Sequence, residues 1–284
     1  MLDWTNLQHF VVLAREGTLS AAARALGVDH ATVARRIAAL EAGCGLKLVD
    51  RRARLYHLTK DGQRVAALAA PMEEAAFAVE RAARAATPGI AGEVSISAPP
   101  SLASMLIAPR LVELRRQHPN IRIKLIGEKR SASLNRREAD LALRLFRPTE
   151  PGLVARKIGF FGFGLYGAPS YIKETPPHAL AFIAYDASME NAPQQRWLKS
   201  IAGEREIVLR TGDLENQAAA ARAGVGLAAL PHFIGQGDPH LMGYDAKAGQ
   251  VGRDVCLVVH RDVRRAPAVR AVMEFLERCL KLPK

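Results

Sequence analysis

The residues best suited to chemistry in this sequence are polar and basic side chains between positions 29 and 41. Val33, Ile37 and Leu40 follow one another at spacings of four and three, which predicts a helix with one apolar side. Groups on the opposite side of such a helix can donate hydrogen bonds to base edges and to phosphate oxygens. The side chains that fall largely off the apolar side are His30, Thr32, Arg35 and Arg36.

This pattern predicts a surface that reads double-stranded DNA. Arg35 is the candidate for reading a base, because arginine matches the O6 and N7 acceptors of guanine, and a phosphate contact is the alternative. Three later arginines are expected to hold phosphates, and an ordinary solvated charged face is the alternative for the whole set. The candidate DNA contacts are Thr18, Ser20, His30, Ala31, Thr32, Ala34, Arg35, Arg36, Arg51, Arg52 and Arg54.

Residues 19–41 have the pattern of two helices joined by a tight turn, which would position these side chains. Gly27 suits a turn with positive φ, and Asp29 is a good N-cap for the second helix. Thr18 and Ser20 begin the first helix, where they can cap it, contact phosphate, or do both. Residues 45–59 then have the pattern of a short hairpin with a basic tip, which is typical of a wing that contacts the DNA backbone or minor groove.

Residues 63–87 form an alanine-rich segment with a heptad pattern. Apolar residues alternate at spacings of three and four, which predicts a seam between paired helices of two chains. The alternative is one amphipathic helix packed on its own domain. Pro71 lies inside the seam and predicts a kink or a restart of the helix. The predicted dimerisation residues are Val65, Leu68, Met72, Ala75, Val79 and Ala82.

After a plausible hinge at residues 87–89, expected strands alternate with expected helices. This alternation predicts an α/β fold with mainly parallel sheets. Helices are expected at residues 101–117, around Trp197, at 214–224 and at about 267–280. Strands are expected at residues 93–98, 121–127, 140–146, 153–159, 162–167, 179–186, 206–211, 225–231 and 255–260.

Composition and charge limit the class of protein. The sequence is 49% hydrophobic but has no uncharged apolar run of 18 residues, so no membrane span is expected. The N-terminus lacks the basic region of a secretory signal, and three scattered cysteines favour a reduced, cytoplasmic protein. The net charge is +12, and the residues after position 91 hold 28 basic and 19 acidic side chains. This excess favours an anionic partner, either DNA or an acidic ligand, and an arginine-rich proteome is the alternative.

The chain resembles the LysR-type transcriptional regulators over nearly its whole length. In the N-terminal segment, the resemblance is carried by Ala21–Ala22, Leu26–Val28, Val33–Ile37, Leu40–Glu41 and Leu58–Thr59 followed by Gly62. Three later landmarks are READLALR at 137–144, LYGAPSYI at 165–172 and RAGVGLAALP at 222–231. The family commonly has other residues at the positions of Asp29, His30, Ala31 and Ala34, so its base preference does not transfer to this chain.

The resemblance implies a domain organisation. It implies a winged helix–turn–helix at residues 1–62, a linker and dimerisation helix at 63–87, and a periplasmic-binding-protein-like effector domain at 91–284. Two strands that cross near 162–166 and 258–264 would join subdomain I (91–163 and 265–284) to subdomain II (166–262). The resemblance also implies a homodimer and a homotetramer.

A small-molecule effector is expected in the crevice between the two subdomains, where the carboxyl ends of strands meet. Each of the candidate residues is also open to a purely structural role. A simple dianion is disfavoured by two carboxylates of the set unless nearby arginines pair with them. The candidate effector contacts are Pro100, Ser101, Leu102, Glu128, Phe146, Asp186, Asn216 and Gln217.

The expected function is a sequence-specific regulator that binds an operator with dyad symmetry and responds to its effector. A metabolite-modifying enzyme with an attached DNA-binding domain is one alternative, and a nucleoid-like DNA binder is another. No GxSxG, HExxH or Walker motif occurs in the sequence. We therefore expect no enzymatic activity, no cofactor and no metal.

Overall fold

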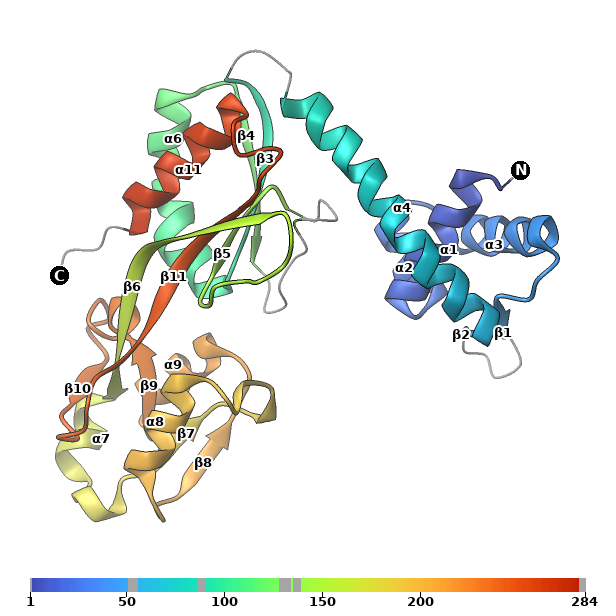
Figure 1. Ribbon diagram of the computed structural model, residues 1–284. Coiled ribbons are helices and arrows are strands. Elements are labelled where there is room, and N and C mark those ends of the chain that lie inside the picture. The colour runs from blue at the N-terminus through green and yellow to red at the C-terminus, as the bar shows by residue number, and fades with distance from the viewer. Residues whose placement is uncertain (1, 51–55, 86–89, 128–133, 135–138, 281–284) are drawn as a thin grey trace. The chain divides into compact units, whose positions relative to one another are not determined.

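The computed structural model of the protein describes residues 2–50, 56–85, 90–127, 134 and 139–280 (Figure 1). For residues 81, 82, 84 and 85 it describes the backbone alone. The chain divides into two compact units, Met1–Arg84 and Ala85–Lys284, each with its own hydrophobic core. The predicted site residues that lie outside the described residues are Arg51, Arg52, Arg54 and Glu128.

The first unit begins with three helices whose ends are set by local capping. The side chains of Asp3, Thr18 and Asp29 accept hydrogen bonds from backbone N–H groups in the first turns of these helices. Glycine with positive φ follows each helix, as predicted for Gly27 in the tight turn. The helices are α1 (Trp4–Glu16), α2 (Leu19–Leu26) and α3 (His30–Cys44).

The predicted hairpin forms after α3. Strand β1 (Val49–Asp50) pairs antiparallel with β2 (His57–Leu58), and Val49 lies opposite Leu58. The next helix, α4 (Lys60–Ala85), starts where the hydroxyl of Thr59 accepts a hydrogen bond from the N–H of Gly62 at 2.9 Å. A Cβ atom at Gly62 would lie 2.1 Å from the carbonyl oxygen of Leu48, so only glycine lets α4 approach the hairpin this closely.

Helix α4 runs through Pro71 as one element, so the predicted restart of the helix is wrong. Pro71 is exposed, while Ala69 and Glu73 on either side of it are buried against the unit. Packing on this side compensates for the backbone hydrogen bond that proline lacks. The first half of α4 therefore belongs to the core of the first unit rather than to a separate segment.

The second unit contains one mixed sheet of nine described strands. Helices lie on both faces of this sheet. The strands are β3 (Gly92–Ala98), β4 (Ile121–Gly127), β5 (Leu141–Arg144), β6 (Leu153–Gly167), β7 (Phe182–Ala184), β8 (Ile207–Arg210), β9 (Leu227–Pro231), β10 (Met242–Tyr244) and β11 (Val251–His260). The α-helices are α5 (Pro100–Leu102), α6 (Leu111–Gln117), α7 (Pro169–Glu174), α8 (Pro193–Ala202), α9 (Leu214–Arg222), α10 (His232–Gly235) and α11 (Pro267–Leu280).

Two long strands connect the two halves of this sheet, as Figure 1 shows. The strand order is β4-β3-β5-β11-β6-β9-β7-β8, with β10 paired to β6. The outer strands of each half are parallel to one another, as predicted. Strands β6 and β11 are antiparallel to each other and to their other neighbours, because the chain passes between the halves once in each direction.

The residues predicted as two strands, 153–159 and 162–167, form the single strand β6. Gly159 and Gly162, at the facing ends of the two predicted strands, form no turn and instead leave space for neighbouring groups. A Cβ atom at Gly162 would lie 2.7 Å from the ring of His232, and one at Gly159 would lie 3.0 Å from the carbonyl oxygen of Leu280. At Phe163, β6 changes its pairing from β11 to β9.

The boundary of subdomain II also differs from the prediction. Val255, Leu257, Val259 and Val263 pack in the same core cluster as β3 and α11, so they belong with subdomain I. The second crossing lies near residues 251–254, opposite residues 160–163 of β6, rather than at 258–264. The strand predicted at residues 255–260 is present within β11, but the sequence carried no information about which strands would lie beside it.

The expected helix at 101–117 is a helical run in four parts. Around Pro109, a π-helical turn (Ala103–Ile107) and a 3-10 turn (Ala108–Arg110) separate α5 from α6. Proline has no N–H to donate and its ring crowds the preceding turn, which explains the irregular turns there. The final helix, α11, has the predicted bounds of 267–280. None of the described helices is both long and apolar enough to cross a membrane.

Candidate DNA-binding and effector-binding sites

The polar side of α3 is largely open to solvent. Val33, Ile37 and Leu40 are buried in the core of the unit, which leaves His30, Ala31 and Arg35 exposed and Thr32 and Ala34 half-buried. The Asp29 carboxylate accepts a hydrogen bond of 2.6 Å from the N–H of Thr32, which fixes the start of the helix. The first turn of α3 therefore presents its side chains in the arrangement that major-groove contact requires.

Arg36 does not join this exposed group. Its Nη1 donates to the side-chain oxygen of Asn6 on α1 at 3.3 Å, and its Nε is buried without an acceptor among the described residues. One residue further along a helix means a rotation of about 100°, which carries Arg36 toward α1. Thr18 is exposed and caps α2 through a hydrogen bond from the N–H of Ala21, and Ser20 is half-buried beside it.

Glu41 is a functional candidate that residue-by-residue reasoning missed. Its carboxylate is 4% exposed, and one of its oxygens accepts hydrogen bonds from the N–H groups of Leu48 and Val49 at 2.8 and 3.1 Å. The end of α3 therefore holds the first strand of the wing directly. Its place at the end of the Leu40–Glu41 motif was the available signal, because a charged residue on an apolar helix side needs a buried partner.

The predicted heptad seam is mostly exposed in the single chain. Leu68, Met72 and Val79 are 68%, 51% and 72% exposed, and Ala75 is also exposed. Val65 is the exception, because it is half-buried against the core of its own unit. The side chain of Ala82, the last member, lies outside the described residues. One side of α4 therefore packs on its own unit, and the side that carries most of the seam is left uncovered in the single chain.

The second unit contains a cavity of about 530 Å³ at the crossing strands. Residues from both subdomains line it, including Ser101 from α5 and Asp213 at the start of α9. Of the predicted effector contacts, the structure places four in the cavity wall: Pro100, Ser101, Leu102 and Phe146.

Three other predicted effector contacts do not line this cavity. The Asp186 carboxylate accepts from the N–H of Ser188 at 2.9 Å and so stabilises a turn. Gln217 is 1% exposed on the inner side of α9. The side chains of Asn216 and Gln217 donate to the hydroxyl and carbonyl oxygens of Thr211. The sequence placed these three residues at the end of the sheet where the cavity lies, because they follow strands. It did not predict the direction in which each side chain points.

Two arginines bring positive charge to the cavity: Arg144, which the sequence suggested only as a partner for nearby carboxylates, and Arg253, which it did not single out. Arg144 is 8% exposed, and its Nη1 donates to the hydroxyl of Ser97 and the carbonyl of Leu143. Arg253 on β11 donates to the carbonyl oxygen of Leu145 and to the side-chain oxygen of Gln194. Burial lowers the pKa of the Arg253 guanidinium from its usual value.

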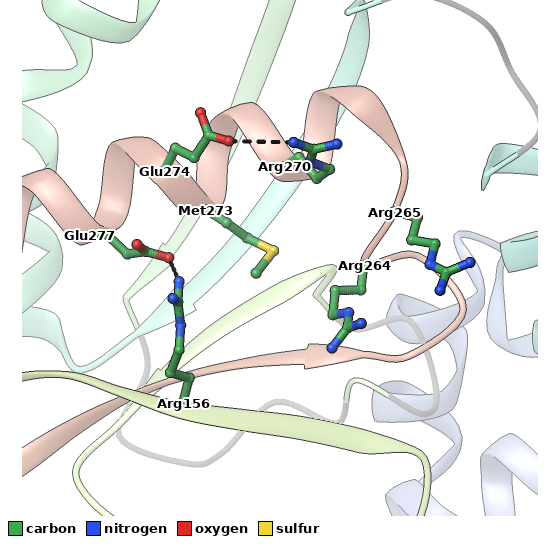
Figure 2. A pocket seen from close by; sticks show the side chains of 7 residues that line it. All are labelled: Arg156, Arg264, Arg265, Arg270, Met273, Glu274 and Glu277. Carbon is green, nitrogen blue, oxygen red and sulfur yellow. Dashed lines mark ion pairs between the residues drawn. The ribbon is translucent and has the colours of Figure 1, made fainter.

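A second hollow, of about 460 Å³, lies beside α11 and is rich in arginine (Figure 2). Arg156 pairs with Glu277, and Arg270 pairs with Glu274 at 3.8 Å. Arg264 and Arg265 also line this hollow, and both are exposed. Its arginines are therefore partly neutralised by its own glutamates, and water screens the rest.

Comparison with known proteins agrees with this architecture. Residues 87–280 match the LysR substrate binding domain, and residues 4–63 match the bacterial regulatory helix-turn-helix domain of the lysR family. The chain belongs to the LysR family of transcriptional regulators. This LysR-type regulator is 30% identical over 238 residues to the AhcY transcriptional activator HvrB of Rhodobacter capsulatus, with 80% of each chain covered. It is 27% identical over 245 residues to the regulator PtxR of Pseudomonas aeruginosa, with 82% of this chain and 78% of PtxR covered.

Solved structures show the same fold. The full-length virulence activator AphB of Vibrio cholerae matches with a TM-score of 0.65 at 22% identity, covering 96% of this chain and 98% of AphB. CrgA of Neisseria meningitidis matches with a TM-score of 0.61 at 21% identity, covering 99% of this chain and all of CrgA. This LysR-type regulator therefore has a helix-turn-helix DNA-binding domain and an effector-binding domain. Its partners are DNA and a small-molecule effector.

Proposed function

We propose that this LysR-type regulator binds an operator with dyad symmetry as a dimer, and that an effector in the 530 Å³ cavity changes how the DNA is bound or bent. The observation that carries the proposal is the cavity itself, because both subdomains contribute to its wall. A molecule that contacts both subdomains favours one arrangement of the two over others. Such a shift changes the spacing and bend that a bound oligomer imposes on DNA.

The proposed dimer forms through α4. The exposed side chains of Leu68, Met72, Ala75 and Val79 lie at heptad spacing on the side of the helix that its own unit leaves uncovered. A dimer places two α3 helices on two half-sites, which is the reason for dyad symmetry in the operator. We further propose a tetramer formed through the effector domains, which the exposed apolar side chains of Met105, Val112 and Val208 support.

Base reading is assigned to the exposed side of α3, with Arg35 as the residue that contacts guanine. Thr18, Ser20 and the arginines of the hairpin tip are assigned to phosphate contacts. Arg36, although basic, is assigned to the α1 contact instead. The regulator acts in the cytoplasm under this proposal, because that is where a bacterial operator lies.

We also propose that the cavity binds its ligand without transforming it. Ser101 and Ser188 line the cavity, but its described lining holds no histidine or lysine that could activate a serine hydroxyl as a nucleophile. The described residues also contain no group of three or more histidine, cysteine, aspartate or glutamate side chains that could hold a metal ion.

A DNase I footprint on the DNA that flanks the gene for this protein tests the proposal. With excess competitor DNA, we expect one protected region of tens of base pairs with dyad symmetry. A ligand that binds the cavity should then alter the length of that region or its hypersensitive positions. Uniform protection at all sequences would contradict specific regulation, and an unchanged footprint at saturating ligand would contradict the effector mechanism.

A further inference from the structure

The walls of the 530 Å³ cavity are mainly apolar and aromatic. Phe161, Phe163 and Phe233 line it, and the rings of Phe161 and Phe233 lie 5.0 Å apart between their centroids. Phe146 at the rim is 52% exposed, which is unusual for a phenylalanine and leaves apolar area for a ligand to cover. A wall of this kind favours a flat hydrocarbon body.

Arg253 supplies the polar contact that would orient such a body. Its Nη2 and Nε donate to the carbonyl oxygen of Leu145 at 2.8 and 3.2 Å, and its Nη1 donates to the Gln194 side chain at 3.2 Å. A guanidinium has five N–H groups, so one on each terminal nitrogen is left without an acceptor among the described residues. Two N–H groups on neighbouring nitrogens match the two oxygens of a carboxylate.

Acidic residues in the cavity lining limit the charge of the ligand. Asp213 and Glu215 line the cavity where α9 begins. Burial raises the pKa of the Tyr185 phenol. The charge of Arg253 lowers this pKa and that of Asp213 raises it, so the phenol lies near enough to both groups to interact with them. These carboxylates would repel a second negative charge on the ligand, which costs binding free energy.

We infer that the cavity takes an organic monocarboxylate with a flat apolar body, whose carboxylate binds the two remaining N–H groups of Arg253. This inference rests on the proposed function, because it names the class of effector for the same cavity. The partners of Arg253 in the protein are a carbonyl and an amide, which hold the guanidinium in place without neutralising it. The carboxylate of the ligand would supply the negative charge that neutralises the buried guanidinium of Arg253.

Three phenyl compounds of similar size test this inference by calorimetry on the full chain without DNA. They are phenylacetate, its neutral isostere phenylacetamide, and the dianion phenylmalonate. We expect phenylacetate to bind at least tenfold more tightly than either of the other two. Indoleacetate and indoleacetamide repeat the comparison with a larger body. Failure of both carboxylates to bind, equal binding of the amides, or tighter binding of phenylmalonate would overturn the inference.

Variants locate the carboxylate. Arg253→Gln should weaken phenylacetate binding at least tenfold. Arg253→Lys keeps the positive charge but loses the planar pair of N–H donors, and it should weaken binding less. The matched control is the double variant Arg264→Gln/Arg265→Gln, which removes two charges from the hollow of Figure 2. Loss of binding in the control with retention in Arg253→Gln would overturn the inference. The melting temperature of each unliganded variant shows whether it folds.

The two proposals fail in different ways. Calorimetry reports binding alone, whereas the footprint reports the effect of binding on DNA. A carboxylate that binds through Arg253 but leaves the footprint unchanged would contradict the effector mechanism and support the ligand class. A footprint that changes with phenylacetamide as strongly as with phenylacetate would contradict the ligand class and support the effector mechanism.

Discussion

Arg15 on α1 and Glu73 on α4 form an ion pair inside the DNA-binding unit. Nη1 of Arg15 lies 3.2 and 3.3 Å from the two carboxylate oxygens of Glu73, whose side chain is 6% exposed. Glu73 immediately follows Met72, a member of the exposed seam on the other side of α4. The pair therefore fixes the rotation of α4 about its axis, and with it the direction in which the seam faces.

Replacing Glu73 with alanine should destabilise the DNA-binding unit. The change removes the partner of Arg15 on α4 and leaves only its contact with Glu16 at 3.0 Å, and hydrogen bonds to charged groups contribute roughly 1.5–3 kcal/mol. We expect the free energy of unfolding to fall by about 2 kcal/mol in urea denaturation. Glu74→Ala, at the exposed neighbouring position, is the control and should have little effect. Equal losses in the two variants would show that the ion pair contributes nothing specific.

Replacing Glu41 with alanine should loosen the wing. The buried N–H groups of Leu48 and Val49 would lose their acceptor, which costs about 1–3 kcal/mol for each group left unsatisfied. We expect lower thermal stability and weaker operator binding at a fixed salt concentration. Glu41→Gln retains one acceptor oxygen and should lose less of both. Unchanged operator affinity in a folded Glu41→Ala protein would show that the wing does not depend on this carboxylate.

Replacing Arg35 and Arg36, which are adjacent on α3, should have different effects. Arg35→Ala should weaken binding to the operator by about 1–3 kcal/mol while leaving binding to bulk DNA nearly unchanged, as expected for a base contact. Arg36→Ala should lower stability without relaxing sequence preference, because its guanidinium contacts Asn6. Gel-shift titrations on operator and random DNA, together with denaturation, separate the two effects. Equal loss on every DNA sequence would make Arg35 a phosphate contact.

A charge in the seam of α4 should separate the dimer. Leu68→Glu would place a carboxylate in the apolar interface of the paired helices, where burial of an unpaired charge is unfavourable. We expect the dimer dissociation constant, from sedimentation equilibrium, to rise at least tenfold. Ala70→Glu is the matched control, because Ala70 is exposed on α4 but outside the heptad positions. A Leu68→Glu protein that dimerises like the control would exclude this seam as the interface.

The cap of α3 should make stability depend on pH. Hydrogen bonding from the Thr32 backbone N–H lowers the pKa of the Asp29 carboxyl from its usual value. The ionised cap therefore stabilises the fold above the ordinary pKa of aspartate, and this contribution is lost as pH falls through the lowered value.

The measurement is the melting temperature against pH for three proteins. Asp29→Ala should melt below the parent at neutral pH, and the gap should close in acid. Asp29→Asn keeps a capping oxygen that does not titrate, so its advantage over Asp29→Ala should persist in acid. A gap between parent and Asp29→Ala that stays constant down to low pH would exclude this cap as the cause.

Local signals in the sequence were sufficient for the helix–turn–helix. Asp29 and Gly27 act within a few residues of their own positions, so cap and turn chemistry alone predicted where α2 ends and α3 begins. The final helix was likewise predicted at about residues 267–280, which are the bounds of α11. Periodicity also predicted that Leu68, Met72, Ala75 and Val79 share one side of α4, and all four are exposed, but it did not predict that Val65 would pack into the core of its own unit.

The cavity could not be predicted in the same way, because its residues come together only through the tertiary fold. Arg253 reaches the carbonyl of Leu145, a residue 108 positions away, and nothing near either one in the sequence marks that contact. Glycines also misled the prediction, since Gly162 looked like a strand end and instead admits the ring of His232. Arg36 shows the same limit on α3, because periodicity does not say which polar side chains a neighbouring helix will recruit.

The pairing of β6 with β11 has a consequence for protein engineering. Val251 lies opposite Phe163, so the chain enters and leaves subdomain II through neighbouring positions. Subdomain II is thus an insertion whose two ends already meet. A short turn from residue 163 to residue 251 would span the gap without stretching the backbone. This junction is therefore the natural place to exchange subdomain II, and with it part of the cavity wall, while keeping the rest of the chain.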